Sequence, residues 1–386
     1  MRIVRLLPIG FLLSAGFAAG CGEDAATTET TETSAALRIS NSASIEGFVQ
    51  QRVIVSEQGD TNDPPDNSGK NLLNAWGLVF SPKGEAWISS NGKETLVAYD
   101  ENGNLLHTIS TTTAKGLDLG APTGVVWNSD RDGFRGDRLI FVTEDGFVGG
   151  ADPAGTNAKK RFSEDNAIYK GCALASSHGK TRLYLADFGN GQIEVLDEHY
   201  RDVKTRGAFI DPGLKDETQH FVPFNVMTAG DRVFVAYAVK QNEGDRDEQA
   251  GPGNGIVDLF DTDGNFLDRL VSHAELDSPW GLALGPDRDD RRASDLLVGN
   301  FGHVVDSENS INVYELSSAG GHVHARFEGA LGDNGTGQPI VIEGLWGIVF
   351  GNGLNGFETD ELYVTAGPND EADGLFSELS FVSQRH

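Results

Sequence analysis

A short apolar phrase recurs six times along the chain, and it constrains the fold more than any other feature. Each copy is a β-type run with one small or polar residue in its middle, which we call the step. The step residues are Gly77, Gly124, Gly171, Asn225, Gly281 and Gly347. Successive steps lie between 47 residues (77 to 124) and 66 residues (281 to 347) apart. This spacing is typical of β-propeller blades that carry insertions.

Each copy continues as a meander of short strands. A polar turn and a second β-branched or aromatic run follow every step, as in residues 86–90 after the first. Most copies then have a Gly-bearing turn and a third run, and two go on through Asn-Gly or Asp-Gly-Asn turns into a fourth. The sequence therefore predicts an all-β, six-bladed propeller of four-stranded antiparallel blades.

The two ends of the repeat region predict how the ring closes. The run 47–55 precedes the first step, and the last copy has only the run 375–382 after its second strand. We expect these terminal strands to share one blade. A glycine step marks the innermost strand, because strands that converge on an axis leave no room for a side chain. Asn225 breaks this pattern, which indicates either a weaker blade or a polar group aimed at the channel.

The N-terminus has the pattern of an export signal. Arg2 and Arg5 precede an apolar core and three small residues, so residues 1–20 are interpreted as a signal peptide. Cys21 follows directly, as in a bacterial lipobox, and is the expected lipidation site; the alternative is ordinary cleavage near Gly20. Residues 21–45 would form a flexible tether rich in Thr, Glu and Ala. Residues 46–386 form the propeller.

The net charge and the hydropathy of the chain limit the kinds of partner that it can bind. The formal net charge of −28 should repel nucleic acid and anionic membrane surfaces. After the leader no stretch reaches the ~18 apolar residues of a spanning helix, so membrane contact is expected only through the lipid. We expect an exported monomer anchored to the cell envelope. Gly22 after Cys21 favours the outer membrane, and without the lipid the protein would be secreted or periplasmic.

Cys172, within an apolar run, is expected to be a buried hydrophobe.

Several phrases together resemble an uncharacterised family of bacterial β-propellers that is distantly similar to NHL-repeat propellers. They are Asn74-Ala75-Trp76-Gly77-Leu78, Glu144-Asp145-Gly146, Tyr169-Lys170-Gly171, Ser278-Pro279-Trp280-Gly281, Gly299-Asn300-Phe301-Gly302 and Thr365-Ala366-Gly367-Pro368-Asn369. The resemblance implies the propeller fold and an exported setting. It implies no reaction, so no catalytic residue follows from it.

The residues next to the steps are candidates for a ligand site at one channel mouth. Trp76, Lys170, Trp280 and Trp346 directly precede their steps and should form a ring. The tryptophans could stack on a sugar or an aromatic ligand while the lysine contacts a carboxylate or phosphate. The alternative is that each tryptophan fills the joint between two blades.

A second set of candidates lies at the ends of the second strands. Glu144, Asp187 and Asn300 could supply oxygen ligands from different blades to a cation such as Ca²⁺. A bound metal could then polarise an ester or lactone carbonyl. The alternative is turn chemistry that needs no ligand. The charged loop 240–255 is either a cation-dependent lid or a loop that is simply exposed to solvent.

The sequence contains no Ser-His-Asp arrangement, no HExxH motif and no Gly-rich phosphate loop. The leading hypothesis is therefore a propeller that binds an envelope protein, a glycan or a small molecule at a channel mouth. The alternative function is a calcium-dependent hydrolase or lyase of the lactonase-like propeller kind. A purely structural surface protein is the third.

Overall fold

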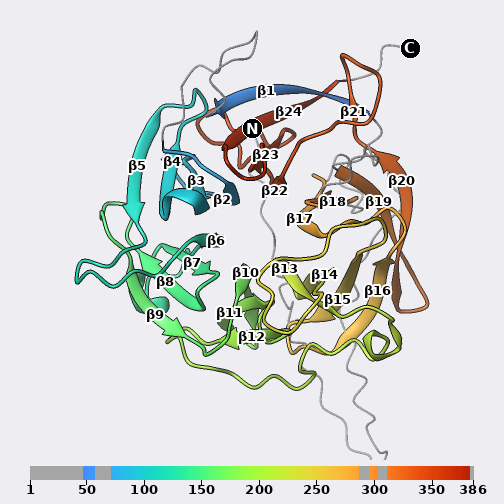
Figure 1. Ribbon diagram of the computed structural model, residues 1–386, viewed down its shortest axis with the longest axis horizontal. Coiled ribbons are helices and arrows are strands. Elements are labelled where there is room, and N and C mark those ends of the chain that lie inside the picture. The colour runs from blue at the N-terminus through green and yellow to red at the C-terminus, as the bar shows by residue number, and fades with distance from the viewer. Residues whose placement is uncertain (1–46, 57–70, 287–294, 303–310, 383–386) are drawn as a thin grey trace, which may run out of the picture.

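The computed structural model describes residues 47–56, 71–286, 295–302 and 311–382. The strands form six sheets arranged around a central axis (Figure 1). The predicted six-bladed, all-β propeller is confirmed. The signal peptide, Cys21 and the tether lie outside the described residues, as do both ends of the chain.

Blades one to three follow one another in sequence and run outward from the axis in strand order. Blade one contains β2 (Ala75–Phe80), β3 (Ala86–Ser90), β4 (Thr95–Tyr99) and β5 (Leu105–Ser110). Blade two contains β6 (Pro122–Trp127), β7 (Leu139–Thr143), β8 (Phe147–Ala151) and β9 (Lys159–Ser163). Blade three contains β10 (Tyr169–Ser177), β11 (Lys180–Asp187) and β12 (Gln192–Leu196).

Blades four to six complete the ring. Blade four contains β13 (Phe221–Ala229), β14 (Arg232–Val239), β15 (Gly255–Asp261) and β16 (Phe266–Ser272). Blade five contains β17 (Pro279–Leu284), β18 (Leu296–Asn300), β19 (Ile311–Ala319) and β20 (His322–Ala330). Blade six contains β22 (Leu345–Phe350), β23 (Leu362–Ala366), β24 (Leu375–Val382), β1 (Phe48–Ser56) and the short β21 (Gly332–Asp333).

Helical structure is confined to single turns in the part of the chain that the structure describes. These are the 3₁₀ helices η1 (Asn91–Lys93), η2 (Phe134–Gly136) and η3 (Leu214–Asp216). None of the described helices is long and apolar enough to span a membrane.

Blade three differs from the others in its outer edge. Its sheet has three strands, and the place of a fourth is taken by one antiparallel bridge between Leu196 and Asp202. The Val203 N–H also donates to the Val195 carbonyl at 2.8 Å. The chain beyond β12 therefore covers the sheet edge without forming a regular strand.

The ring closes through the last blade, as the two terminal runs predict. β1 pairs antiparallel with β24 from Phe48 opposite Val382 to Ser56 opposite Leu375. The N-terminal strand is thus built into a blade whose other three long strands come from the C-terminus. This pairing joins the two ends of the described chain by backbone hydrogen bonds within one sheet.

The step residues lie on the six innermost strands, and their glycines are required by close backbone approach. A Cβ on Gly77 would lie 2.6 Å from the Thr123 carbonyl, and one on Gly124 would lie 2.6 Å from the Cys172 nitrogen. Asn225 instead fastens two blades, because its Nδ2 donates to the Trp280 carbonyl at 2.6 Å. The exception to the glycine pattern is therefore a link between blades four and five.

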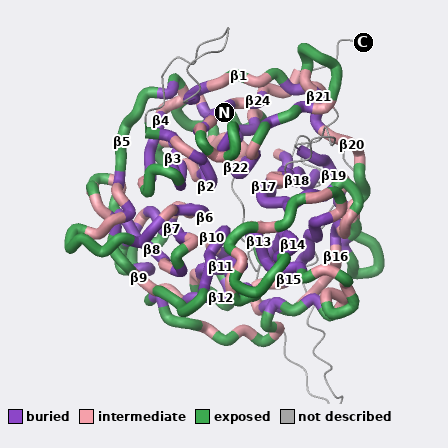
Figure 2. The backbone as a smooth tube through the Cα atoms, viewed as in Figure 1, coloured by how far each residue is buried: buried purple, intermediate pink, exposed green. Residues whose placement is uncertain are grey.

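The core lies between the blades, where buried residues follow the inner strands and exposed ones the outer rim (Figure 2). Cys172 packs in one of these clusters, between blades two and three. It is a free, buried cysteine, and burial raises its pKa far above the usual value. The expectation that Cys172 is a buried hydrophobe is confirmed.

Candidate functional site

The three tryptophans that precede steps contact one another at the end of the channel where the inner strands begin. The rings of Trp76 and Trp346 stack with centroids 3.4 Å apart, and Trp346 also stacks on Phe301 at 3.6 Å. Trp280 lies edge-on to Trp76 at 6.0 Å and to Trp346 at 5.8 Å. The structure therefore brings these residues together as a buried aromatic cluster that fills this end of the channel.

Lys170 reaches into the same cluster. Its side chain is 1% exposed, and its Nζ lies 2.6 Å from Oε1 of Glu144. The ammonium also lies over three rings, at 5.1 Å from Trp76, 5.6 Å from Phe188 and 5.9 Å from Phe224. One carboxylate and several aromatic faces thus compensate the buried charge.

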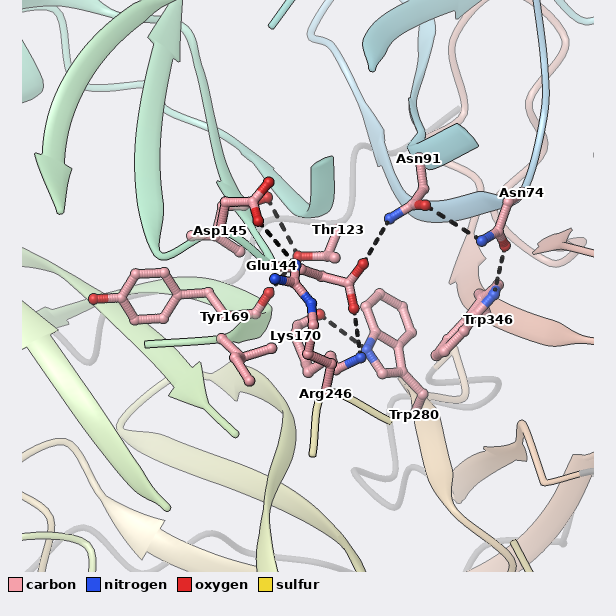
Figure 3. Close-up of polar contacts among 12 residues, drawn as sticks. Asn74, Asn91, Thr123, Glu144, Asp145, Tyr169, Lys170, Arg246, Trp280 and Trp346 are labelled. Atoms are coloured by element: carbon pink, nitrogen blue, oxygen red, sulfur yellow. Dashed lines mark hydrogen bonds and ion pairs between the residues drawn. The ribbon is translucent and has the colours of Figure 1, made fainter. Parts of the chain in front are cut away.

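A chain of hydrogen bonds connects this ion pair to the tryptophan cluster across four blades (Figure 3). Trp346 Nε1 donates to Asn74 Oδ1 at 3.0 Å, and Asn74 Nδ2 donates to Asn91 Oδ1 at 3.4 Å. Asn91 Nδ2 then donates to Oε2 of Glu144 at 3.4 Å. Both oxygens of Glu144 are therefore held, one by the asparagine chain and one by Lys170.

Trp280 closes the network from the opposite side. Its Nε1 donates to the Lys170 carbonyl at 3.0 Å, which ties blade five to blade three across the channel. By contrast, Trp76 Nε1 is buried and has no hydrogen-bond partner among the described residues. An unpaired N–H of this kind costs free energy that a ligand acceptor or a water molecule could recover.

Carboxylates outnumber the cationic side chains of Lys170 and Arg246 at this end of the channel. Burial alone would raise the pKa of Glu144, but the Lys170 ammonium holds it below the ordinary value. The pKa of Glu248 is raised to about 7, mainly by burial and in part by the nearby Asp247 and Glu371, while Lys170 lowers it. The pKa of Glu371 is raised by burial and by the charges of Glu144 and Asp247. Burial is the main cause of both raised values, and the neighbouring carboxylates add to it, because negative charges gather at this end of the channel.

The charged loop between β14 and β15 contributes directly to the site. Nη2 of Arg246 lies 3.0 Å from Oδ1 of Asp145, and the Arg246 side chain reaches the group in Figure 3. At the base of the loop, Lys240 Nζ donates to the Gly189 carbonyl at 2.8 Å. The loop is therefore fastened to blades two and three, and it carries Asp247 and Glu248 into the neighbourhood of Lys170.

Of the three residues predicted to bind a metal, only Glu144 is seen to contact the predicted ligand ring. Oδ1 of Asp187 accepts from the Ile168 N–H at 3.1 Å, and Oδ1 of Asn300 accepts from the Asp277 N–H at 3.0 Å. Both hold the start of their own blade, as turn chemistry would require. Within the described ranges, no group of three or more His, Cys, Asp or Glu side chains is placed to hold a metal ion. The calcium site stays a prediction.

Sequence reasoning missed the contribution of Glu371. This residue ends a run of three non-glycine residues in the left-handed region, Asn369, Asp370 and Glu371, with φ of 57°, 51° and 63°. Nothing in the local pattern predicts such a run, because only the surrounding fold holds it in place. The role of Asn74 and Asn91 as links between blades likewise required the structure.

Comparison with curated sequences gives relatives that are themselves uncharacterized. No family model matches the chain. Two curated relatives from Acanthamoeba polyphaga mimivirus are similar to it, the uncharacterized proteins L690 and R648. L690 is 27% identical over 325 residues, covering 80% of each chain. R648 is 26% identical over 324 residues, covering 80% of this chain and 75% of the relative.

The solved structures that resemble the chain do so at low sequence identity. Catalytically inactive virginiamycin B lyase from Staphylococcus aureus with quinupristin is 13% identical, with a TM-score of 0.49 over 87% of this chain and 100% of that chain. A protein of unknown function from Bacteroides thetaiotaomicron is 11% identical, with a TM-score of 0.49 over 87% of this chain and 76% of that chain. By its own strand pairing, the chain is a six-bladed β-propeller.

Proposed function

We propose that the protein is an exported, lipid-anchored propeller of the cell envelope that binds a cationic group at the acidic end of its channel. Export and anchoring are supported by the leader and by Cys21. The resemblance to an uncharacterised bacterial propeller family supports the same setting. The ligand class is supported by the charges around Lys170.

The observation that carries the proposal is the excess of carboxylate over ammonium at one place. Glu144, Glu248 and Glu371 all interact electrostatically with the single ammonium of Lys170. The side chains come from blade two, the loop after β14 and the segment after β23, so three separate parts of the fold meet here. An ammonium or guanidinium group of a ligand would be attracted to this excess charge, most strongly at low salt.

The existing pairs disfavour the carboxylate or phosphate ligand that the sequence left open. Lys170 faces Glu144 at 2.6 Å, and Arg246 faces Asp145 at 3.0 Å. An anion would have to displace one of these carboxylates to reach a cation. A cationic ligand needs no such displacement, because it adds a partner to Glu371 and Glu248.

Glu371 is the residue best placed to meet such a ligand. It is only partly buried, and its backbone lies in the left-handed region at φ 63°. Such a conformation costs free energy for a non-glycine residue and persists only where the surrounding fold holds it. The segment is fixed by hydrogen bonds, among them Glu371 N–H to the Gly367 carbonyl at 3.1 Å. The carboxylate is thus presented at the mouth before any ligand arrives.

Thermal unfolding with a panel of cations tests the proposal. Spermidine and arginine amide should raise the melting temperature more than sodium chloride at equal ionic strength, because binding to the native state alone stabilises it. Glu371→Gln should reduce the rise. The control Glu358→Gln changes an exposed glutamate in the turn between β22 and β23, at the far end of the channel, and should leave the rise unchanged.

The same panel includes calcium and a chelator. A rise with calcium alone, abolished by the chelator and absent with spermidine, would contradict the proposal. It would instead favour the calcium site of Glu144, Asp187 and Asn300, and with it the hydrolase or lyase alternative. An equal rise in wild-type protein and in Glu371→Gln would place cation binding elsewhere on this acidic chain.

A further inference from the structure

We propose a second binding site, for a small apolar molecule, in the part of the channel beyond the step residues. A cavity of about 200 Å³, partly open to solvent, lies here and is lined by all six inner strands. Trp280 of the aromatic cluster borders it, and the remaining lining residues are steps or lie after them along the inner strands. The aromatic cluster therefore separates the cavity from the end of the channel at which Glu144 lies.

The cavity walls are apolar in every blade. One lining residue from each of the six blades shows this, in the order Leu78, Val126, Cys172, Met227, Leu282 and Ile348. The step glycines Gly77, Gly124 and Gly347 expose backbone instead of side chains. An environment of this kind favours apolar over polar ligands, because burying apolar surface is favourable and a polar group would lose its water.

The polar side chains in the lining are already satisfied by the protein. Asn225 Nδ2 donates to the Trp280 carbonyl at 2.6 Å, and Asn225 Oδ1 accepts from the Val226 N–H at 2.8 Å. The Thr228 hydroxyl donates to the Leu174 carbonyl at 2.7 Å. Water in the cavity gains little from these groups, so an apolar ligand can displace it at small cost.

The volume sets the size of the ligand. Engineered apolar cavities of roughly 150 Å³ in another protein bind benzene. A cavity of about 200 Å³ therefore has room for benzene or a slightly larger aromatic or branched aliphatic group. The site differs in chemistry from the proposed cation site, because none of its lining residues is charged.

Methionine methyl resonances provide a direct test with benzene as the probe. The chain has two methionines, Met1 and Met227, and Met227 lines the cavity. Without the predicted signal peptide, residues 21–386 contain Met227 as their one methionine. In this chain labelled with ¹³C-methyl methionine, benzene should produce a saturable shift of the Met227 methyl signal through the ring current.

Cavity-filling variants make the test specific. Val126→Phe adds volume to the lining and should abolish the saturable shift, whereas Val341→Phe, at a residue 67% exposed, should retain it. If Val126→Phe does not fold, Val349→Phe fills the same cavity from blade six. No saturable shift up to the solubility of benzene, or a shift that persists in the folded cavity-filling variants, would overturn the proposal. Neither result bears on spermidine binding, so failure here is distinguishable from failure of the proposed function.

Discussion

Lys170 shows how a single residue can hold a site together. Replacing it with Met removes the ammonium and leaves the carboxylate of Glu144, 15% exposed, without its ion-pair partner. Removing one partner of a buried pair costs about 3 to 5 kcal/mol. We therefore expect Lys170→Met to lower the unfolding free energy by this order, measured by urea denaturation.

The matched control is Lys159→Met, at an exposed lysine on the outer strand β9. An exposed substitution of this kind should change the unfolding free energy by less than about 0.5 kcal/mol. Equal effects of the two substitutions would show that the ion pair of Lys170 contributes nothing beyond a surface charge.

Asp258 makes a second residue-level prediction, through pH. It is fully buried in β15, and its Oδ1 lies 3.7 Å from Nε of Arg269. The pKa of Asp258 is raised to about 9, mainly by burial and in part by the neighbouring Asp211. The pKa of Asp258 in the folded protein exceeds its value of about 4 in the unfolded chain. Protonated Asp258 therefore contributes its full stability below about pH 4, and this contribution is lost as the pH rises through 9.

Unfolding free energies measured between pH 6 and about pH 10 should therefore fall less steeply for Asp258→Asn than for wild-type protein. Asp231→Asn, at an aspartate whose side chain is 60% exposed, should retain the wild-type slope. An unchanged slope in Asp258→Asn would mean that this carboxyl ionises in the folded protein as it does in the unfolded chain.

The sequence pattern predicted which residues lie at the site better than it predicted which of them contact one another. Trp76, Lys170, Trp280 and Trp346 shared one position in the repeat, and the shared position brought them to one end of the channel. The partner of Lys170 could not be predicted, because Glu144 belongs to another blade and was assigned to the metal candidates. Contacts between blades depend on how neighbouring sheets are rotated, which no local pattern encodes.

The strands themselves were the most predictable elements. The alternation of short β runs and Gly-bearing turns identified the blades, and the two unpaired terminal runs identified the closure. Blade three departs from the pattern, since a bridge at Leu196 and Asp202 replaces a regular outer strand. The segment beyond β12 satisfies the sheet edge through tertiary contacts, which periodicity does not report.

The closing strand β1 allows a paired test. Val49 is fully buried in the last blade, whereas the adjacent Gln50 is exposed on the opposite face of the strand. Val49→Asp should lower the unfolding free energy by roughly 3 kcal/mol or more, because an unpaired carboxylate enters an apolar core. Gln50→Asp changes the charge equally at the surface. If both variants unfold at the same urea concentration, closure by β1 does not stabilise the ring.

The whole molecule presents two chemically different regions along one channel. One end has an aromatic cluster, a buried ammonium and an excess of carboxylates; the other part has apolar walls. The net charge of −28 shows that the chain is acidic but not where its carboxylates gather. The place where the carboxylates gather is set by the fold, which brings six steps that are far apart in sequence into one ring.

Calorimetric titration of the protein with spermidine at low and at high sodium chloride tests cation binding at this mouth most directly. We expect a saturable heat at low salt that weakens as salt screens the carboxylates. Loss of one charge in Glu371→Gln should weaken binding about tenfold, which corresponds to about 1.4 kcal/mol, while Glu358→Gln should bind as wild type. The absence of saturable heat at low salt, or equal affinity for wild type and Glu371→Gln, would contradict a cation site at the acidic end of the channel.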